Sequence, residues 1–161
     1  MRSINRSKNH AILISKLREK DPKTGIAVFS TIKALQCYAA VLGFDHGRRE
    51  KFDRKDTDNI EWHTFNNDDY TQYIYLSALA EANSMDVLKY DVEQSDFTGL
   101  SDDMVKIFEE YAHGGFNILQ NWLDKNPADT FGAKAIISSL HKKGYLDDDA
   151  KKETEFDEVN F

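Results

Sequence analysis

Basic side chains gather in one short stretch of the chain, between positions 45 and 58. The stretch reads DHGRREKFDRKDTD. Arginine and lysine contact nucleic-acid phosphates whatever the base sequence, and arginine suits this chemistry well because its planar guanidinium donates several hydrogen bonds in a fixed fork. The pattern therefore gives a set of candidate nucleic-acid contacts: Arg48, Arg49, Lys51, Arg54 and Lys55.

Acidic residues are interleaved with these basic ones, which weakens the case for phosphate contact. An equal number of opposite charges favours a solvated loop held by its own salt bridges, because such a loop presents little net charge to a polyanion. A third interpretation is that Arg48 and Arg49 pair with acids elsewhere in the same fold. The interleaved acids are Asp45, Glu50, Asp53, Asp56 and Asp58.

Other residue types that perform chemistry do not form a recognisable set. The five histidines are far apart and lack the i, i+4 pair of a helical metal site, so we expect no metal ion and no cofactor. Asp58 with Glu61, or Asp91 with Glu93, could begin a nuclease site, but two-metal chemistry needs convergent acids and usually a lysine. No Glu-x-Lys motif and no Gly-x-Ser-x-Gly turn are present. The chain therefore resembles a binding protein more than an enzyme.

The glycine pair in His113-Gly114-Gly115 has two interpretations. Glycine turns at helix starts can bring backbone amides close to an anion. The interpretation we favour is a bend that lets two helices pack closely, because two glycines are costly inside a helix. This stretch is accordingly predicted to separate a helix beginning at residues 101–103 from a second one over 116–124.

Aromatic and thiol groups also have a structural and a functional interpretation. Tyr70, Tyr73 and Tyr75 lie on one predicted helix, where core packing is favoured over stacking on nucleic-acid bases. Cys37 is the only cysteine, so the chain has no disulfide framework and no thiolate metal site. A small buried hydrophobe is the favoured role for Cys37, since free cysteine is among the most buried residue types.

The helix predicted over residues 30–42 must position the basic stretch. Ser30 or Thr31 offers a hydroxyl that can cap its first amides, and apolar residues then recur at steps of three and four. Gly43 suits the left-handed position that ends a helix. We expect this helix to be the centre of the core and to lead directly into the basic stretch. Its predicted inward residues are Ile32, Leu35, Ala39 and Leu42.

Similar spacing predicts further helices over 10–20, 70–83 and 130–143, with residues 60–65 as a short extended segment. The fold class is therefore all-α, a compact single-domain bundle of five to seven helices. Residues 1–146 form the predicted helical domain, within which 1–8 are a flexible basic arm. Residues 147–161 are predicted to be an acidic disordered tail, because acids there outnumber apolar residues.

Charge and hydropathy limit the partners. The net charge of −7 argues against nucleic-acid binding over the whole surface and leaves room only for a local basic face. The longest apolar run near the start, residues 11–14, is too short for a signal peptide or a membrane span. We therefore expect a cytoplasmic protein that does not contact a membrane.

Two stretches carry a family resemblance. AAVLGFDHGRRE (residues 39–50) and EEYAHGGFNIL (residues 109–119) resemble the DNA phosphorothioation-associated proteins called protein 4 of the Dnd system. The resemblance covers residues 25–125 and leaves out the arm and the tail. It implies a bacterial antiviral defence system of modification and restriction, which replaces a non-bridging phosphate oxygen of DNA with sulfur or restricts DNA lacking that mark. It supplies no catalytic motif.

The first functional hypothesis is therefore a non-catalytic accessory component of such a system. Its expected partners are other proteins of the defence system, with DNA as a further candidate. One alternative is a divergent metal-dependent nuclease or DNA-processing subunit of the same system. Another is a self-associating helical regulator, a homo-oligomer that makes no contact with nucleic acid.

Overall fold

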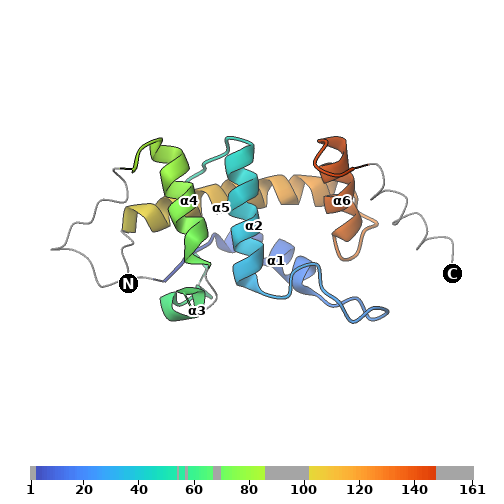
Figure 1. The fold of residues 1–161 in the computed structure, drawn as a ribbon. Coiled ribbons are helices and arrows are strands. Elements are labelled where there is room, and N and C mark those ends of the chain that lie inside the picture. The colour runs from blue at the N-terminus through green and yellow to red at the C-terminus, as the bar shows by residue number, and fades with distance from the viewer. Residues whose placement is uncertain (1–2, 54, 57, 67–69, 86–101, 148–161) are drawn as a thin grey trace.

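The computed structural model is built from helices arranged along one long helix (Figure 1). It describes residues 3–53, 55–56, 58–66, 70–85 and 102–147. Within these ranges the all-α prediction is confirmed, with six α-helices and no strand beyond two isolated bridges. The elements in chain order are η1 (Lys8–His10), α1 (Ala11–Arg18), α2 (Ile32–Asp45), α3 (Trp62–Asn66), α4 (Thr71–Ala82), α5 (Asp102–Asp124) and α6 (Ala133–Lys142).

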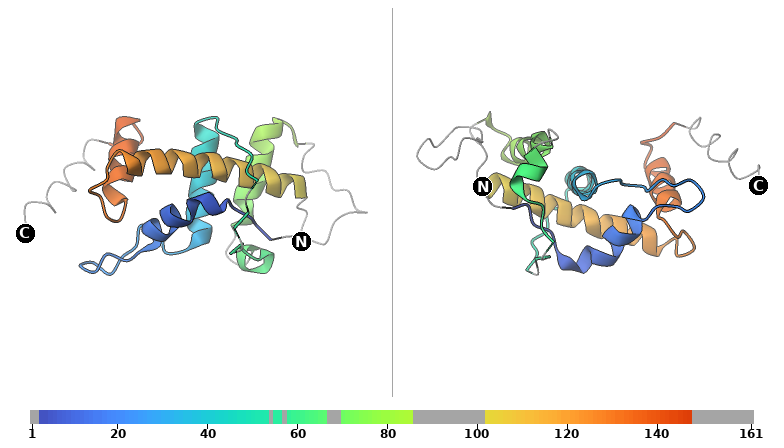
Figure 2. Two further views of the ribbon diagram at one scale, coloured as in Figure 1. Left: turned by 180° about the vertical axis from the view of Figure 1, so that it is seen from behind. Right: turned by 90° about the horizontal axis from the view of Figure 1, so that it is seen from below.

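Helix α2 is the centre of the core, as predicted. Thr31 caps its start, where the side-chain oxygen accepts a hydrogen bond of 3.2 Å from the amide of Ala34. Leu35, Ala39 and Leu42 are buried on the predicted apolar face. Helix α2 crosses α5, and the view from below in Figure 2 shows α2 end-on while α5 extends lengthwise beside it. The two longest helices thus meet at one crossing point.

Small residues at this crossing let the two backbones touch. A Cβ atom on Gly43 would lie 2.0 Å from the carbonyl oxygen of Tyr111, and one on Gly115 would lie 1.7 Å from that of Ala39. The predicted helix end at Gly43 is wrong, because α2 continues to Asp45. Gly43 is needed for close approach to α5 and not for a turn.

Helix α5 is continuous from Asp102 to Asp124, so the predicted interruption at residues 113–115 is also wrong. Each glycine costs about 1 kcal/mol in a helix relative to alanine. Buried residues on both sides of the pair, among them Phe108 and Leu119, keep the helix packed through this region. The close helix packing that we favoured for these glycines is present, without the bend.

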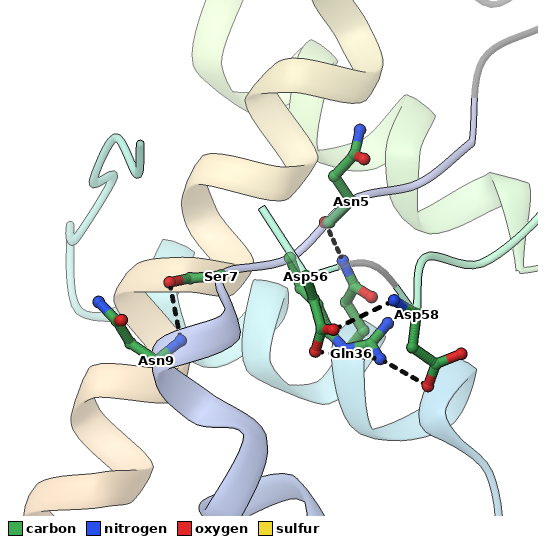
Figure 3. Close-up of polar contacts among 7 residues, drawn as sticks. Asn5, Ser7, Asn9, Gln36, Asp56 and Asp58 are labelled. Carbon is green, nitrogen blue, oxygen red and sulfur yellow. Dashed lines mark hydrogen bonds and ion pairs between the residues drawn. The ribbon is translucent and has the colours of Figure 1, made fainter. Parts of the chain in front are cut away.

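The N-terminal segment 4–7 is buried, in contrast to the flexible arm predicted for residues 1–8. Ile4 has no exposed surface, and its amide and carbonyl exchange hydrogen bonds of 2.8 and 3.0 Å with Ile60. The main chain of Asn5, between the two bridges, is held by side chains: Gln36 donates to its carbonyl at 2.8 Å, and its amide donates to Glu109 at 2.6 Å. Figure 3 shows Asn5 above the amide group of Gln36. Hydrogen bonds from two helices therefore anchor this segment.

The predicted extended segment 60–65 is extended only at its start. Ile60 forms an isolated antiparallel bridge with Ile4, and α3 begins at Trp62. Phe65 of α3 is fully buried and meets Phe108 of α5 edge-on, with ring centroids 5.7 Å apart. Burial of Phe65 explains why a short helix forms here.

The remaining elements pack around α2 and α5. Helix α1 buries Leu13, Ile14 and Leu17 but leaves Ile12 exposed. The chain leaves α6 through Gly144, whose φ of +77° is a left-handed conformation that glycine adopts readily. None of the helices in the described part is long and apolar enough to cross a membrane. The tail was predicted over 147–161, and its residues 148–161 lie outside the described part, as do the acids Asp91 and Glu93.

Aromatic and thiol residues take the structural roles that we favoured. Tyr70, Tyr73 and Tyr75 are partly buried and pack against the core. Cys37 is buried, and burial raises the pKa of its thiol to about 12. A thiol with this pKa is almost entirely protonated at neutral pH, which is unfavourable for a nucleophile.

Candidate nucleic-acid interface

The segment that follows α2, residues 47–56, is here called the exit segment. It leaves the end of α2 and passes along α5 toward α3 (Figure 2). Gly47 has a φ of +63° and allows the turn. The amide of Glu50 then donates to the carbonyl of Glu110 at 3.1 Å, and a Cβ atom on Gly114 would lie 1.8 Å from the carbonyl oxygen of Arg48. The first part of the exit segment therefore lies directly on the backbone of α5.

Arg49 joins three elements through ion pairs. Its Nε lies 2.7 Å from Glu110 of α5, and its Nη1 lies 2.6 Å from Glu81 of α4. Tyr111 donates its hydroxyl to the other oxygen of Glu81. These hydrogen bonds from Tyr111 and Arg49 lower the pKa of Glu81, while burial followed by the contact with Glu81 raises the pKa of Tyr111 to about 12. Arg49 is thus engaged within the fold.

Arg48 is also engaged, through Glu50. Its Nε donates to Glu50 at 2.7 Å, and the second carboxylate oxygen of Glu50 accepts from Asn117 at 2.6 Å. Two of the three interpretations for this basic stretch are present in the structure: Arg48 pairs with Glu50 of the same stretch, and Arg49 pairs with acids elsewhere in the fold. Arg54 lies outside the described residues.

The two predicted lysines, Lys51 and Lys55, are both exposed and border a cleft between the exit segment and α5. Its volume is about 370 Å³. In the described part of the chain, no carboxylate lies within ion-pair distance of Lys51, Lys55 or the exposed Lys106 of α5. The lining residues are Lys51, Phe52, Asp53 and Lys55 from the exit segment and Lys106, Glu109 and Glu110 from α5.

Glu109 and Glu110 line the cleft but are only 4% exposed. Glu109 accepts from the main-chain amide of Asn5 at 2.6 Å and from its side-chain amide at 3.1 Å. Glu110 accepts from Arg49. Both carboxylates therefore already accept hydrogen bonds within the protein. The exposed charged groups around the cleft are the three lysines and Asp53.

A pair of histidines, His10 and His113, lies next to the exit segment, where His113 contacts Phe52. His10 Nε2 and His113 Nδ1 lie 3.0 Å apart, so one ring donates a hydrogen bond to the other. The Phe52 ring packs on His113 with centroids 5.2 Å apart, and Phe116 stacks on His10 at 5.1 Å. Burial, followed by the charge of His113, lowers the pKa of His10 to about 4, with Glu50 opposing the shift. Burial also lowers the pKa of His113.

The lowered pKa values of His10 and His113 predict that the protein loses stability in mild acid. A neutral histidine with a lowered pKa binds fewer protons than the unfolded chain between pH 6.5 and about 4. Stability should therefore be complete above pH 6.5 and fall as the pH drops through this window, by roughly 3 kcal/mol for His10. Urea unfolding at several pH values measures it. A His10→Gln variant should show a flatter dependence between pH 6.5 and 4.5, and an unchanged slope would contradict the prediction.

The acids that suggested a nuclease have other contacts. Arg6, buried beneath the exit segment, pairs with Asp58 at 2.9 Å and with Asp56 at 3.5 Å. Figure 3 shows Asp56 and Asp58 close together beside Gln36. Glu61 lies 3.3 Å from His63, and both are exposed. Within the described ranges, no three or more histidine, cysteine or acidic side chains are grouped to hold a metal ion.

Sequence reasoning missed Lys106, Glu109 and the histidine pair. His10 and His113 are 103 positions apart, and no local pattern links them. Lys106 and Glu109 stand three positions apart on α5, so their spacing indicated a common helix face, but nothing in the sequence indicated that the exit segment covers that face.

Comparison with known families extends the resemblance to nearly the whole chain. The family described as DNA sulphur modification system-associated protein 4 matches residues 3–161, including the N-terminal segment and the acidic end that the two sequence motifs left out. No curated protein and no solved structure matches the chain. The chain belongs to the family of DNA sulphur modification system-associated protein 4.

Proposed function

We propose that the chain is a non-catalytic accessory component of a DNA phosphorothioation-linked modification or restriction system in bacterial defence. It acts by binding other proteins of that system and DNA. Membership of the family supports the association with the system. The observation that supports DNA contact is the exit segment, which presents the exposed Lys51 and Lys55 from a main chain bonded to α5 at Glu50 and bridged to Ser7 at Lys55.

A fixed main chain favours binding because less conformational freedom is lost when a partner arrives. The net charge of −7 keeps long-range attraction to DNA weak, so contact depends on the local basic face and is sensitive to salt. Arg48 and Arg49 brace the segment through their ion pairs. Arg54 remains a predicted contact.

Fluorescence anisotropy with a labelled duplex, with and without phosphorothioate linkages, tests DNA contact. We expect binding at low salt that weakens as salt rises. We also expect the variant Lys51→Ala with Lys55→Ala to bind about tenfold more weakly. The matched control is Lys142→Ala with Lys143→Ala at the end of α6, which removes the same charge from residues that do not line the cleft. Absence of binding at low salt, or equal losses in both variants, would contradict DNA contact.

The same samples separate the alternatives. Metal-dependent cleavage of the duplex that disappears in Asp58→Ala or Glu61→Ala would establish a nuclease in place of an accessory protein. A defined oligomer in light scattering, together with no binding to either duplex, would establish a self-associating regulator. A pull-down of system proteins that leaves the duplex intact is the result expected for an accessory component.

A further inference from the structure

We propose that the cleft between the exit segment and α5 binds one backbone phosphate group of DNA at its rim, and that Lys106 of α5 is a third contact beside Lys51 and Lys55. This proposal rests on the proposed function, since it names the groups that DNA meets. Nothing in the basic stretch itself indicated Lys106, which lies 55 and 51 positions from the other two lysines.

The three lysines come from two elements but border one cleft of about 370 Å³. All three are exposed, and none has a carboxylate within ion-pair distance in the described part of the chain. Arg48 and Arg49, by contrast, already hold Glu50, Glu81 and Glu110. Compared with these two arginines, the three lysines are therefore the residues whose N–H donors have no carboxylate partner in the described part of the chain. A lysine ammonium binds phosphate as a compact point charge.

The floor of the cleft determines how deep an anion can go. Glu109 and Glu110 line it and are buried, and they accept hydrogen bonds from Asn5 and Arg49, respectively. A second negative charge placed against them would be repelled in a region of low dielectric. A phosphate is therefore expected to stay at the rim, where water and the lysines surround it. The exposed Asp53 lies on the same rim and opposes binding.

A polyanion with repeated charges fits this arrangement better than a small free anion. Duplex DNA carries a charge about every 3.4 Å along each strand. While one phosphate lies at the rim beside the three lysines, its neighbours on the strand remain close to the same positive charge. An acidic protein segment also carries repeated negative charges, but its carboxylates differ from phosphates in geometry. It therefore serves as the competing ligand in the test.

The test compares single variants in the duplex anisotropy assay over a range of salt concentrations. Lys106→Ala should weaken binding by about fivefold and reduce the slope of log K against log salt by about 0.9. Lys106→Arg should restore both, because the charge is kept. Asp53→Asn should strengthen binding about twofold or more, since it removes a negative charge from the rim. Lys142→Ala, at the end of α6 and not among the residues that line the cleft, should change neither quantity.

The outcomes distinguish this proposal from the proposed function. If the unaltered protein does not bind the duplex, DNA contact itself fails. If it binds and Lys106→Ala keeps its affinity and salt slope, the cleft proposal is overturned while contact through the exit segment stands. Competition by polyglutamate as effective as that of DNA at equal charge would assign the cleft to an acidic protein and overturn the proposal. Circular dichroism of each variant confirms the fold, and all three lysines are exposed.

Discussion

Gly115→Ala is expected to destabilise the protein by about 3 kcal/mol or more. The added Cβ would lie 1.7 Å from the carbonyl oxygen of Ala39 and 2.5 Å from its carbonyl carbon, and neither atom can move without shifting α2. The better helix propensity of alanine returns only about 1 kcal/mol. Urea unfolding followed by circular dichroism measures the change, and the unfolding temperature should fall by several degrees.

Gly144→Ala is the matched control for this change. Its added Cβ meets nothing within 4 Å, so only the φ of +77° opposes it, at a cost of about 1 kcal/mol. Gly43→Ala should resemble Gly115→Ala, because its Cβ would lie 2.0 Å from the carbonyl oxygen of Tyr111 at the same crossing. Equal stability of Gly115→Ala and the unaltered protein would show that the helices can separate without loss.

Arg49→Ala is expected to lower the free energy of unfolding by about 2 to 3 kcal/mol. The Glu110 side chain is 5% exposed and would keep a buried charge without its cation. This loss in the free energy of unfolding is smaller than that for a fully buried ion pair because Arg49 is itself 33% exposed. Arg49→Lys should recover only part of the loss, since one ammonium cannot reproduce the forked contact with Glu81 and Glu110.

Arg48→Ala provides the neighbouring control. Its side chain is 45% exposed and its partner Glu50 is 31% exposed, so the loss should stay below about 1 kcal/mol. A double-mutant cycle of Arg49→Ala with Glu110→Ala should give a larger coupling energy than the same cycle for Arg48 and Glu50. Similar losses for the two arginines would indicate that Arg49 is not a structural brace.

Much of the helical fold followed from local patterns. Thr31 signalled the start of α2 through its capping hydroxyl, and Asp102 with Asp103 signalled the start of α5. The inward face of α2 could be predicted because apolar residues recur at helical spacing. The basic exit segment could also be recognised from the sequence alone.

The errors share a physical cause. Gly43 was interpreted as a helix end and the pair Gly114-Gly115 as a bend, whereas α2 and α5 continue through these positions and the glycines admit a partner backbone that is distant in sequence. Residues 1–8 were predicted to be a flexible basic arm, yet Gln36 and Glu109 bind the main chain of Asn5 within it. The cleft was missed for the same reason: Lys106 joins Lys51 and Lys55 only once α5 lies against the exit segment.

The hydrogen bond between Asn5 and Glu109 links positions separated by 104 residues. During synthesis on the ribosome, the opening residues must therefore wait for most of the chain before they gain their final partners. Loop closure over such a span costs entropy before any contact compensates for it, so this step is expected to come late in folding. A nascent chain stalled before residue 109 would leave the amide of Asn5 without its carboxylate partner.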